Sequence, residues 1–433
     1  MATIIKQIQN SNYVPSNTNQ TGYTAVNSSQ FWWDSAKYDG TVTMYWECIL
    51  KSTNASYTAY SELYDKTGAA AVTDSPVSTT STTPVRARSA AITLTTEHEY
   101  YSLVKISNAA AYVYYYNSQL VIKQTGTITK TETQVFLGSG YATTSSTYED
   151  FAHGTLFYYN SGVWDGSVTV YFEAELVLLA DATDAYAALY DTDDNLVADS
   201  EVHITASGWT RQRSAAITLT HGKTYKVKYK CDGGGSGINV RQARLIIQQA
   251  NFNTTESHYP IVQDMKYTDA SNTTLNTLMA VYWDNDEWDV YSKLVYHEAV
   301  LQILGGGGTI TATAELYDGA AVDDSLATTS GNKDRVRSAA LTLDDNTTYW
   351  ARIKTSNGSY QASLFYSAIV VYAILTSTPH TKTLDTETAT LTEAITSAAV
   401  RHAPLTSETA TLTETITQTL HSWLVRVWHI IFG

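Results

Sequence analysis

Short stretches in which apolar and polar residues alternate run along most of this chain. In the segment 44–50, for example, Trp46 and Cys48 share one face of an extended strand, whereas Tyr45 and Glu47 share the opposite face. A period of two is typical of a β-strand with one face in the core and the other partly wet. Because about eight such strands recur in each third of the chain without a convincing helix, we predict antiparallel two-sheet sandwiches of the jelly-roll kind.

The strands are organised as three copies of one module. The pattern R-x-R-S-A-A-[IL]-T-L occurs at 86–94, 211–219 and 335–343, which places its serines 125 and 124 residues apart. A period of that length corresponds to a whole domain. The prediction is therefore all-β: sandwich domains at 1–126, 127–251 and 252–375, followed by a Thr-rich tail at 376–433.

Each copy also repeats an aromatic strand and a turn that joins an aromatic residue to Asp. The aromatic blocks are Phe31-Trp32-Trp33, Phe157-Tyr158-Tyr159 and Val281-Tyr282-Trp283, and the turns are Tyr38-Asp39, Trp164-Asp165 and Trp288-Asp289. In a sandwich, alternate aromatic side chains pack in the core, and only every second ring can face outward to stack on a sugar. Core packing and a sugar platform both stay open at this stage.

Composition narrows the function classes. The chain has 42 acidic against 27 basic residues and a net charge of −15, which argues against a nucleic-acid partner. Its two cysteines cannot form a disulfide framework, and no Cys/His spacing indicates zinc. No nucleophile motif is present. We therefore predict a non-enzymatic protein without an organic cofactor.

One charged signature is retained in all three copies of a chain that otherwise avoids charge. Its members are Tyr45, Glu47, Arg86 and Arg88; Tyr171, Glu173, Arg211 and Arg213; and Tyr296, Glu298, Arg335 and Arg337. Residues two apart on a strand share a face, so the two arginines of a copy lie together. We favour a cross-strand Glu–Arg pair with the tyrosine packed over it. The alternative is a ligand site for a sugar or an anion.

The densest acidic run lies in the third copy. Asp284, Asp286 and Asp289 offer the carboxylate oxygens that Ca²⁺ prefers. A structural calcium ion or a solvated loop would both explain this run.

The tail has a shorter repeat of its own. Residues 384–396 recur at 405–417 with Leu and Ile at seven- and four-residue spacing, as in a coiled-coil seam. Thr is a poor helix former, so a self-associating stalk and a flexible spacer both remain open. The final segment is strongly apolar but too short to span a membrane. We expect it to attach the chain to a partner, through Trp423, Leu424, Val427, Trp428 and Ile431.

The blocks of the module follow one order: a Tyr-x-Glu strand, then Leu-Tyr-Asp, then R-x-R-S-A-A. In this order the module resembles jelly-roll modules of the carbohydrate-binding kind, over residues 5–375. Secreted adhesins and phage tail or virion proteins string such modules together. The resemblance implies an extracellular or virion-associated structural or binding protein that assembles with itself, or with a larger structure, through its tail. A secreted glycan-binding adhesin or filament subunit, with surface glycans as partners, is the alternative.

Overall fold

The computed structural model of the protein describes residues 2–9, 16–26, 30–151, 154–179, 182–233, 237–262, 266–267, 274–304, 310–357 and 359–375. Within these ranges the chain forms strands and three short 3₁₀ helices, Ser35–Lys37, Ser161–Val163 and Asn285–Glu287. No helix in these ranges is long and apolar enough to cross a membrane. The tail and the five predicted attachment residues lie outside the described residues.

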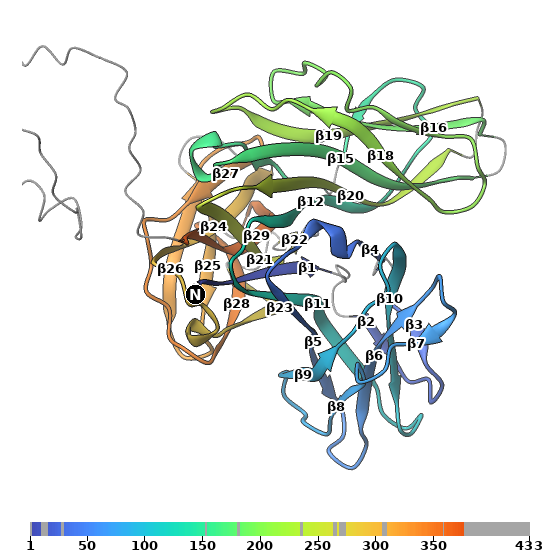
Figure 1. Ribbon diagram of the computed structural model, residues 1–433, viewed down its shortest axis with the longest axis vertical. Coiled ribbons are helices and arrows are strands. Elements are labelled where there is room, and N and C mark those ends of the chain that lie inside the picture. Colours follow the sequence, from blue (N-terminus) through green and yellow to red (C-terminus); the bar gives the residue numbers. More distant parts are fainter. Residues whose placement is uncertain are drawn as a thin grey trace, which may run out of the picture. The chain divides into compact units, whose positions relative to one another are not determined.

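The first repeat is a two-sheet sandwich (Figure 1). Its inner sheet, so called because it faces the other repeats, has the order β1 (Ala2–Gln9), β11 (Val113–Gly126), β5 (Thr41–Ser52) and β9 (Val85–Ile92), with β2 (Ser16–Thr18) also paired to β11. Its outer sheet has the order β3 (Thr24–Ala25), β10 (His98–Ile106), β6 (Ala59–Asp65) and β7 (Ala70–Ala71). In that sheet β4 (Phe31–Trp33) also pairs with β10, and β8 (Val77–Thr79) with β6.

The second and third repeats have the same plan. Their inner sheets are β12 (Lys130–Thr143), β20 (Ile238–Ala250), β15 (Ser167–Leu178) and β18 (Thr210–Ile217); and β21 (Thr254–Val262), β29 (Gln361–Ile374), β24 (Ser292–Leu304) and β27 (Asp334–Arg337). Their outer sheets are β13 (Glu149–Asp150), β19 (Thr224–Asp232), β16 (Asp184–Asp191) and β17 (Val202–Ile204); and β23 (Thr274–Trp283), β28 (Thr347–Thr355), β25 (Ala312–Tyr317) and β26 (Val322–Thr328). The short strands β14 (Phe157–Tyr158) and β22 (Lys266–Tyr267) pair with β19 and β29.

This strand order confirms the jelly roll. In every repeat the first strand pairs with the last, the last with the long strand that carries Tyr-x-Glu, and that strand with the R-x-R strand. The remaining strands form the second sheet, as in an eight-stranded jelly roll. All the pairings are antiparallel.

The core of each repeat lies between its two sheets and contains the predicted face of the alternating strand. Trp46 and Phe172 are fully buried there, and Cys48 is 1% exposed, as expected of a small core residue. The third repeat has His297 at this position. Its two ring nitrogens lie 2.8 Å from Asp324 Oδ2 and 3.1 Å from Ser367 Oγ, so its polar atoms are satisfied inside the core.

The opposite face of the alternating strand is predicted to be partly wet. Tyr45, Tyr171 and Tyr296 on that face are half-buried, but for the glutamates the prediction is wrong. Glu47, Glu173 and Glu298 are only 3%, 7% and 1% exposed. The three repeats belong to one compact unit, 1–376, in which the inner sheet of each repeat packs against a neighbouring repeat. A jelly roll that stood alone would leave this face in water.

The first strands of the three repeats meet around one buried lysine. The Lys6 ammonium, 1% exposed, donates to the hydroxyls of Thr133 and Thr255 and to the carbonyl of Glu256, each at 2.7 Å. Burial lowers the pKa of Lys6 well below its usual value, against the opposing effect of Glu256. One side chain of β1 therefore contacts both β12 and β21.

The repeated Asp turns connect successive repeats. Asp39 Oδ1 accepts from the backbone N–H groups of Thr129 and Lys130, both at 2.9 Å. Asp165 Oδ1 likewise accepts from the backbone at 253 and 254, at 2.8 and 2.7 Å. The backbone of Asp289 pairs with that of Thr3, at 2.5 and 3.3 Å. Each turn thus holds the start of the next repeat, and the third turn holds the start of the first.

Candidate functional site

The charged signature forms a compact cluster in each repeat, which we call the signature cluster: one Tyr, one Glu and two Arg. In the first repeat, Glu47 Oε2 accepts from the Nε atoms of Arg86 and Arg88, both at 2.8 Å. Its other oxygen accepts from Gln119 Nε2 at 2.9 Å. A buried carboxylate with three donors is well compensated.

The other two signature clusters have the same geometry. Glu173 accepts from Arg211 and, at 3.0 Å, from Arg213 Nε. Glu298 accepts from Arg335 Nε at 2.7 Å and from Arg337 Nε at 2.8 Å. The predicted cross-strand Glu–Arg pair is therefore present in all three repeats.

The signature tyrosines cover the second arginine of each pair. The guanidinium carbons of Arg88, Arg213 and Arg337 lie 4.9, 5.5 and 5.3 Å from the ring centroids of Tyr45, Tyr171 and Tyr296. These are cation–π distances. The predicted packing of the tyrosine over the pair is confirmed.

The serine of R-x-R-S-A-A also has a structural role, which the sequence did not reveal. Pairing between β5 and β9 shifts register at Tyr45/Glu47, which leaves the N–H of Trp46 without a ladder partner. Ser89 Oγ accepts from that N–H at 2.9 Å. Ser214 and Ser338 do the same for Phe172 and His297, at 2.9 and 3.0 Å.

In repeats 2 and 3 the arginines keep the buried glutamate ionised. Burial alone would raise the pKa of Glu298, but Arg335 and Arg337 outweigh it and lower that pKa to about 2. The pKa of Glu173 is lowered too, because Arg211 and Arg213 overcome its burial. The signature clusters of repeats 2 and 3 thus keep their charges inside the protein.

A neighbouring repeat covers the first arginine of each signature cluster. The guanidinium carbons of Arg86, Arg211 and Arg335 lie 3.9, 5.1 and 5.2 Å from the ring centroids of Tyr282, Trp32 and Tyr158. These rings are the middle residues of the three aromatic blocks. Their sequence neighbours Phe31 and Trp33 are buried in the core, so the outward ring of the block packs on another repeat.

The covering contacts follow a cyclic order. The signature cluster of repeat 1 faces repeat 3, that of repeat 2 faces repeat 1, and that of repeat 3 faces repeat 2. In the first case Glu287 of repeat 3 also forms a salt bridge with Arg88. We name the three contacts junctions 1/3, 1/2 and 2/3. All twelve signature residues lie at or beside these junctions, and ligand binding by them stays a prediction.

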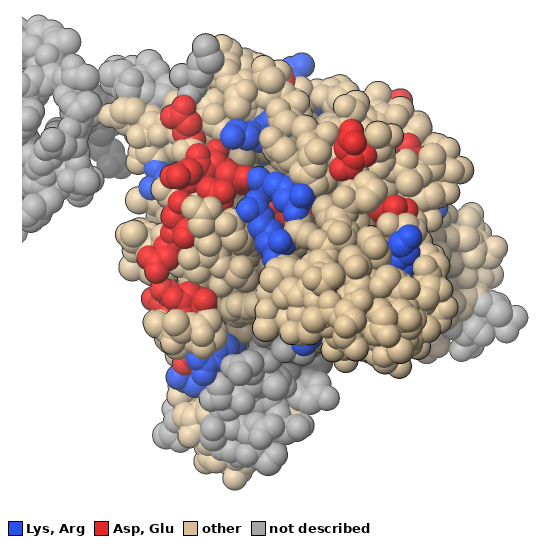
Figure 2. All heavy atoms as spheres, turned by 90° about the horizontal axis from the view of Figure 1, so that it is seen from below, with Lys and Arg blue, Asp and Glu red and all other residues tan. Residues whose placement is uncertain are grey.

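The predicted calcium ligands are used differently. Asp284 Oδ1 accepts from the N–H of Asp286 at 3.1 Å, and the backbone of Asp289 pairs with Thr3. The described part of the chain contains no group of three His, Cys, Asp or Glu that could hold a metal ion. On the face seen in Figure 2, acidic side chains form a band down one side of the molecule, next to a group of basic ones. Calcium at these three aspartates remains a prediction without a preformed ligand cluster.

The contacts of His297 bring together the residue types of a hydrolase triad, Ser367, His297 and Asp324. Ser367 and His297 are both fully buried between the sheets. A substrate cannot reach them, so the arrangement serves the core.

No family model matches this chain, and no curated protein matches it. Among solved structures it is similar to the CBM22-1–CBM22-2 tandem domain of Xyn10C from Paenibacillus barcinonensis, at 10% identity over 56% of this chain and 93% of that one, with a TM-score of 0.16. It is also similar to a triple jelly roll protein of an archaeal virus with a turret assembly, at 9% identity over 86% and 90% of the two chains, with a TM-score of 0.19. Because both TM-scores are far below 0.5, no property is carried over from these structures.

Proposed function

We propose that this chain is a non-enzymatic structural or binding protein, extracellular or virion-associated, in which three jelly rolls are locked into one building block. The observation that supports this most directly is the position of the signature clusters. The residues that recur in all three repeats lie where the repeats meet. The feature that the repeats share is therefore the way in which they pack against one another.

The burial and the charge pairing of the signature clusters favour a packing role over three open ligand sites. Each glutamate is almost fully buried and is compensated by two arginines, and an aromatic ring of another repeat covers one of these. Such an array gives specific geometry because both charge and donor directions must match. We propose that the tail then assembles these blocks with one another or with a larger structure.

A secreted glycan-binding adhesin or filament subunit is the second candidate. It is favoured by a polar cavity of about 420 Å³ between repeats 2 and 3, which lies away from the junction 1/2 and 1/3 clusters.

Light scattering tests the assembly role. We expect the full chain to form a defined oligomer and a chain ending at Leu375 to be monomeric. If the full chain and the truncated chain are both monomeric, the tail does not assemble the protein.

Glu173→Ala tests the packing role of the signature cluster. It leaves Arg211 and Arg213 partly buried without their carboxylate, which we expect to lower the free energy of unfolding by about 3 kcal/mol. Urea denaturation measures this, with Glu201→Ala, an exposed carboxylate, as the control. Unchanged stability together with lost ligand binding would instead make the cluster a ligand site.

A further inference from the structure

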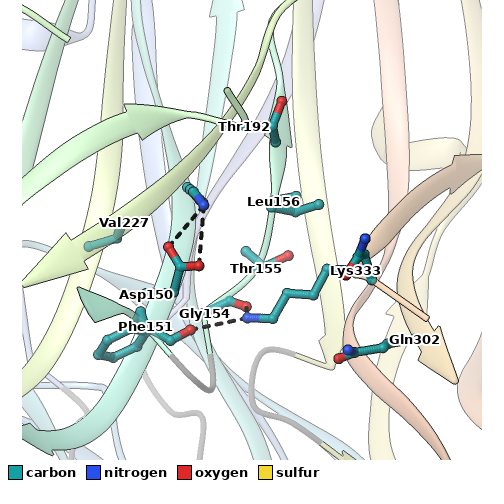
Figure 3. A pocket seen from close by; sticks show the side chains of 11 residues that line it. Asp150, Phe151, Gly154, Thr155, Leu156, Thr192, Val227, Gln302 and Lys333 are labelled. Atoms are coloured by element: carbon teal, nitrogen blue, oxygen red, sulfur yellow. Dashed lines mark hydrogen bonds and ion pairs between the residues drawn. The ribbon is translucent and has the colours of Figure 1, made fainter. Parts of the chain in front are cut away.

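A cavity of about 420 Å³ lies between repeats 2 and 3 (Figure 3). This is within the range of about 300–1,000 Å³ that small-molecule sites occupy. Leu156 and Val227 form apolar parts of its wall. The polar lining residues are Asp150, Thr155, Thr192 and Lys226 from repeat 2 and Gln302, Asn332 and Lys333 from repeat 3.

Lys333 builds one side of this cavity. Its ammonium crosses the junction and donates to the carbonyls of Phe151 and Gly154, at 3.1 and 2.6 Å. Its nitrogen also lies 4.3 Å from the ring centroid of Phe365. Burial lowers the pKa of Lys333 to about 8. A charged residue therefore lies at the edge of a mainly apolar junction, where it binds the carbonyls of Phe151 and Gly154 beside the cavity.

This lining is particular to junction 2/3. Lys333 stands two residues before the first signature arginine, where repeat 1 has Pro84 and repeat 2 has Trp209. Trp209 stacks with Arg241, whose guanidinium carbon is 3.9 Å from the ring centroid. Asn332 likewise corresponds to Thr83 and Gly208. The polar lining therefore does not follow from the shared fold.

The cavity presents both donors and acceptors. Asp150 pairs with Lys226 at 3.0 Å and keeps an exposed carboxylate, with 59% of its side chain accessible. Gln302 donates from its amide nitrogen to the carbonyl of Gly331, at 2.7 Å, and contributes an amide group to the lining. The hydroxyl of Thr155, buried in the wall, has no hydrogen-bond partner in the described structure.

We propose that this cavity binds the end of a saccharide. A sugar ring carries hydroxyls that both donate and accept, and C–H faces that pack on apolar side chains. Carboxylate, amide and ammonium groups around an apolar wall complement that chemistry. A purely anionic ligand fits less well, because Asp150 would face it. The proposal rests on the binding part of the proposed function, and it does not depend on assembly through the tail.

The test is a saccharide panel on the full chain, followed by titration calorimetry. The panel contains neutral hexoses, amino sugars and uronic acids, as monosaccharides and disaccharides. We expect at least one to bind, and Asn332→Ala and Asp150→Asn each to weaken it about tenfold, as expected for a lost hydrogen bond to a charged or buried polar group. Thr83→Ala, at the equivalent place in repeat 1, should leave the affinity unchanged.

Melting temperatures show that each variant is folded before its affinity is compared. Binding of no saccharide in the panel would overturn the proposal, as would binding that both cavity variants leave intact. The light-scattering result is independent of either outcome, so a failure of the cavity and a failure of the assembly role are distinguishable.

Discussion

Junctions 1/2 and 2/3 use the same positions of the jelly roll with opposite chemistry. In junction 1/2 the carbonyl of Gln30 accepts from the amide of Gln242 at 2.6 Å and from Arg244 at 3.2 Å. Arg241 forms a salt bridge at 2.9 Å with Glu175, which is 3% exposed. These contacts of junction 1/2 are polar and charged.

Junction 2/3 replaces these side chains with apolar ones. Leu156 takes the place of Gln30, Val300 that of Glu175, Phe365 that of Arg241 and Tyr366 that of Gln242. These four residues pack together in one buried cluster with Ala368 and Val370.

This difference explains why each of the three similar repeats packs against one particular neighbour. If repeat 1 docked on the apolar surface of repeat 3, Gln30 would be buried without partners. If Leu156 stood in the place of Gln30 at junction 1/2, Arg241 would lose the side-chain oxygen to which it donates. An unpaired buried polar group costs about 1–3 kcal/mol, so mismatched docking is disfavoured. The shared positions give the junctions the same geometry, and the side chains at these positions determine which repeat packs against which.

Phe365→Ala should break junction 2/3 with the largest effect. Phe365 is 2% exposed, and truncation of a buried Phe costs about 4 kcal/mol. Urea denaturation of the full chain measures the loss. A loss below that of an exposed substitution such as Tyr112→Ala would show that the apolar cluster does not hold this junction.

The signature cluster at junction 2/3 should make stability depend on acid. The folded pKa of Glu298 is about 2, below its ordinary value of 4.5. The stability it contributes is fully present above pH 4.5 and is lost as the pH falls toward 2, by about 3 kcal/mol. In Glu298→Gln this part of the acid dependence should vanish. Urea midpoints at several pH values test it, and parallel curves for both proteins would contradict it.

Arg241→Ala sharpens the comparison at the position equivalent to Phe365. It removes the partner of the buried Glu175 and should cost about 2 kcal/mol, less than Phe365→Ala, because hydrogen bonds to charged groups contribute that much. Burial raises the pKa of Glu175 despite Arg241, so protonation partly relieves the loss at low pH. The same urea titration gives the value. If Arg241→Ala and Phe365→Ala lower the free energy of unfolding equally, the two junctions do not differ in the way described.

Salt should have the smallest effect and should separate the junctions directly. Raising ionic strength from about 0.05 to about 0.5 M shortens the screening length several-fold. Arg241 keeps 18% of its side chain accessible to solvent and salt. We therefore expect the free energy that protects the amides at junction 1/2 from hydrogen exchange to fall by less than about 1 kcal/mol. Amides around the apolar cluster of Leu156, Val300, Phe365 and Tyr366 at junction 2/3 should not change. Hydrogen exchange followed by mass spectrometry resolves the two sets, and identical changes would argue against a polar and an apolar junction.

The sequence by itself determined the repeats, the alternating strands and the Glu–Arg pair. Those features have a local period or recur at a fixed spacing, so Trp46 and Glu47 were assigned to opposite faces and Arg86 and Arg88 to the same one. Only the tertiary structure decided what covers the second face. Contacts such as Arg211 with Trp32, or Lys6 with Thr133 and Thr255, join residues far apart in the chain. No local period encodes such contacts, because they arise when each folded module buries its inner sheet against a neighbouring repeat.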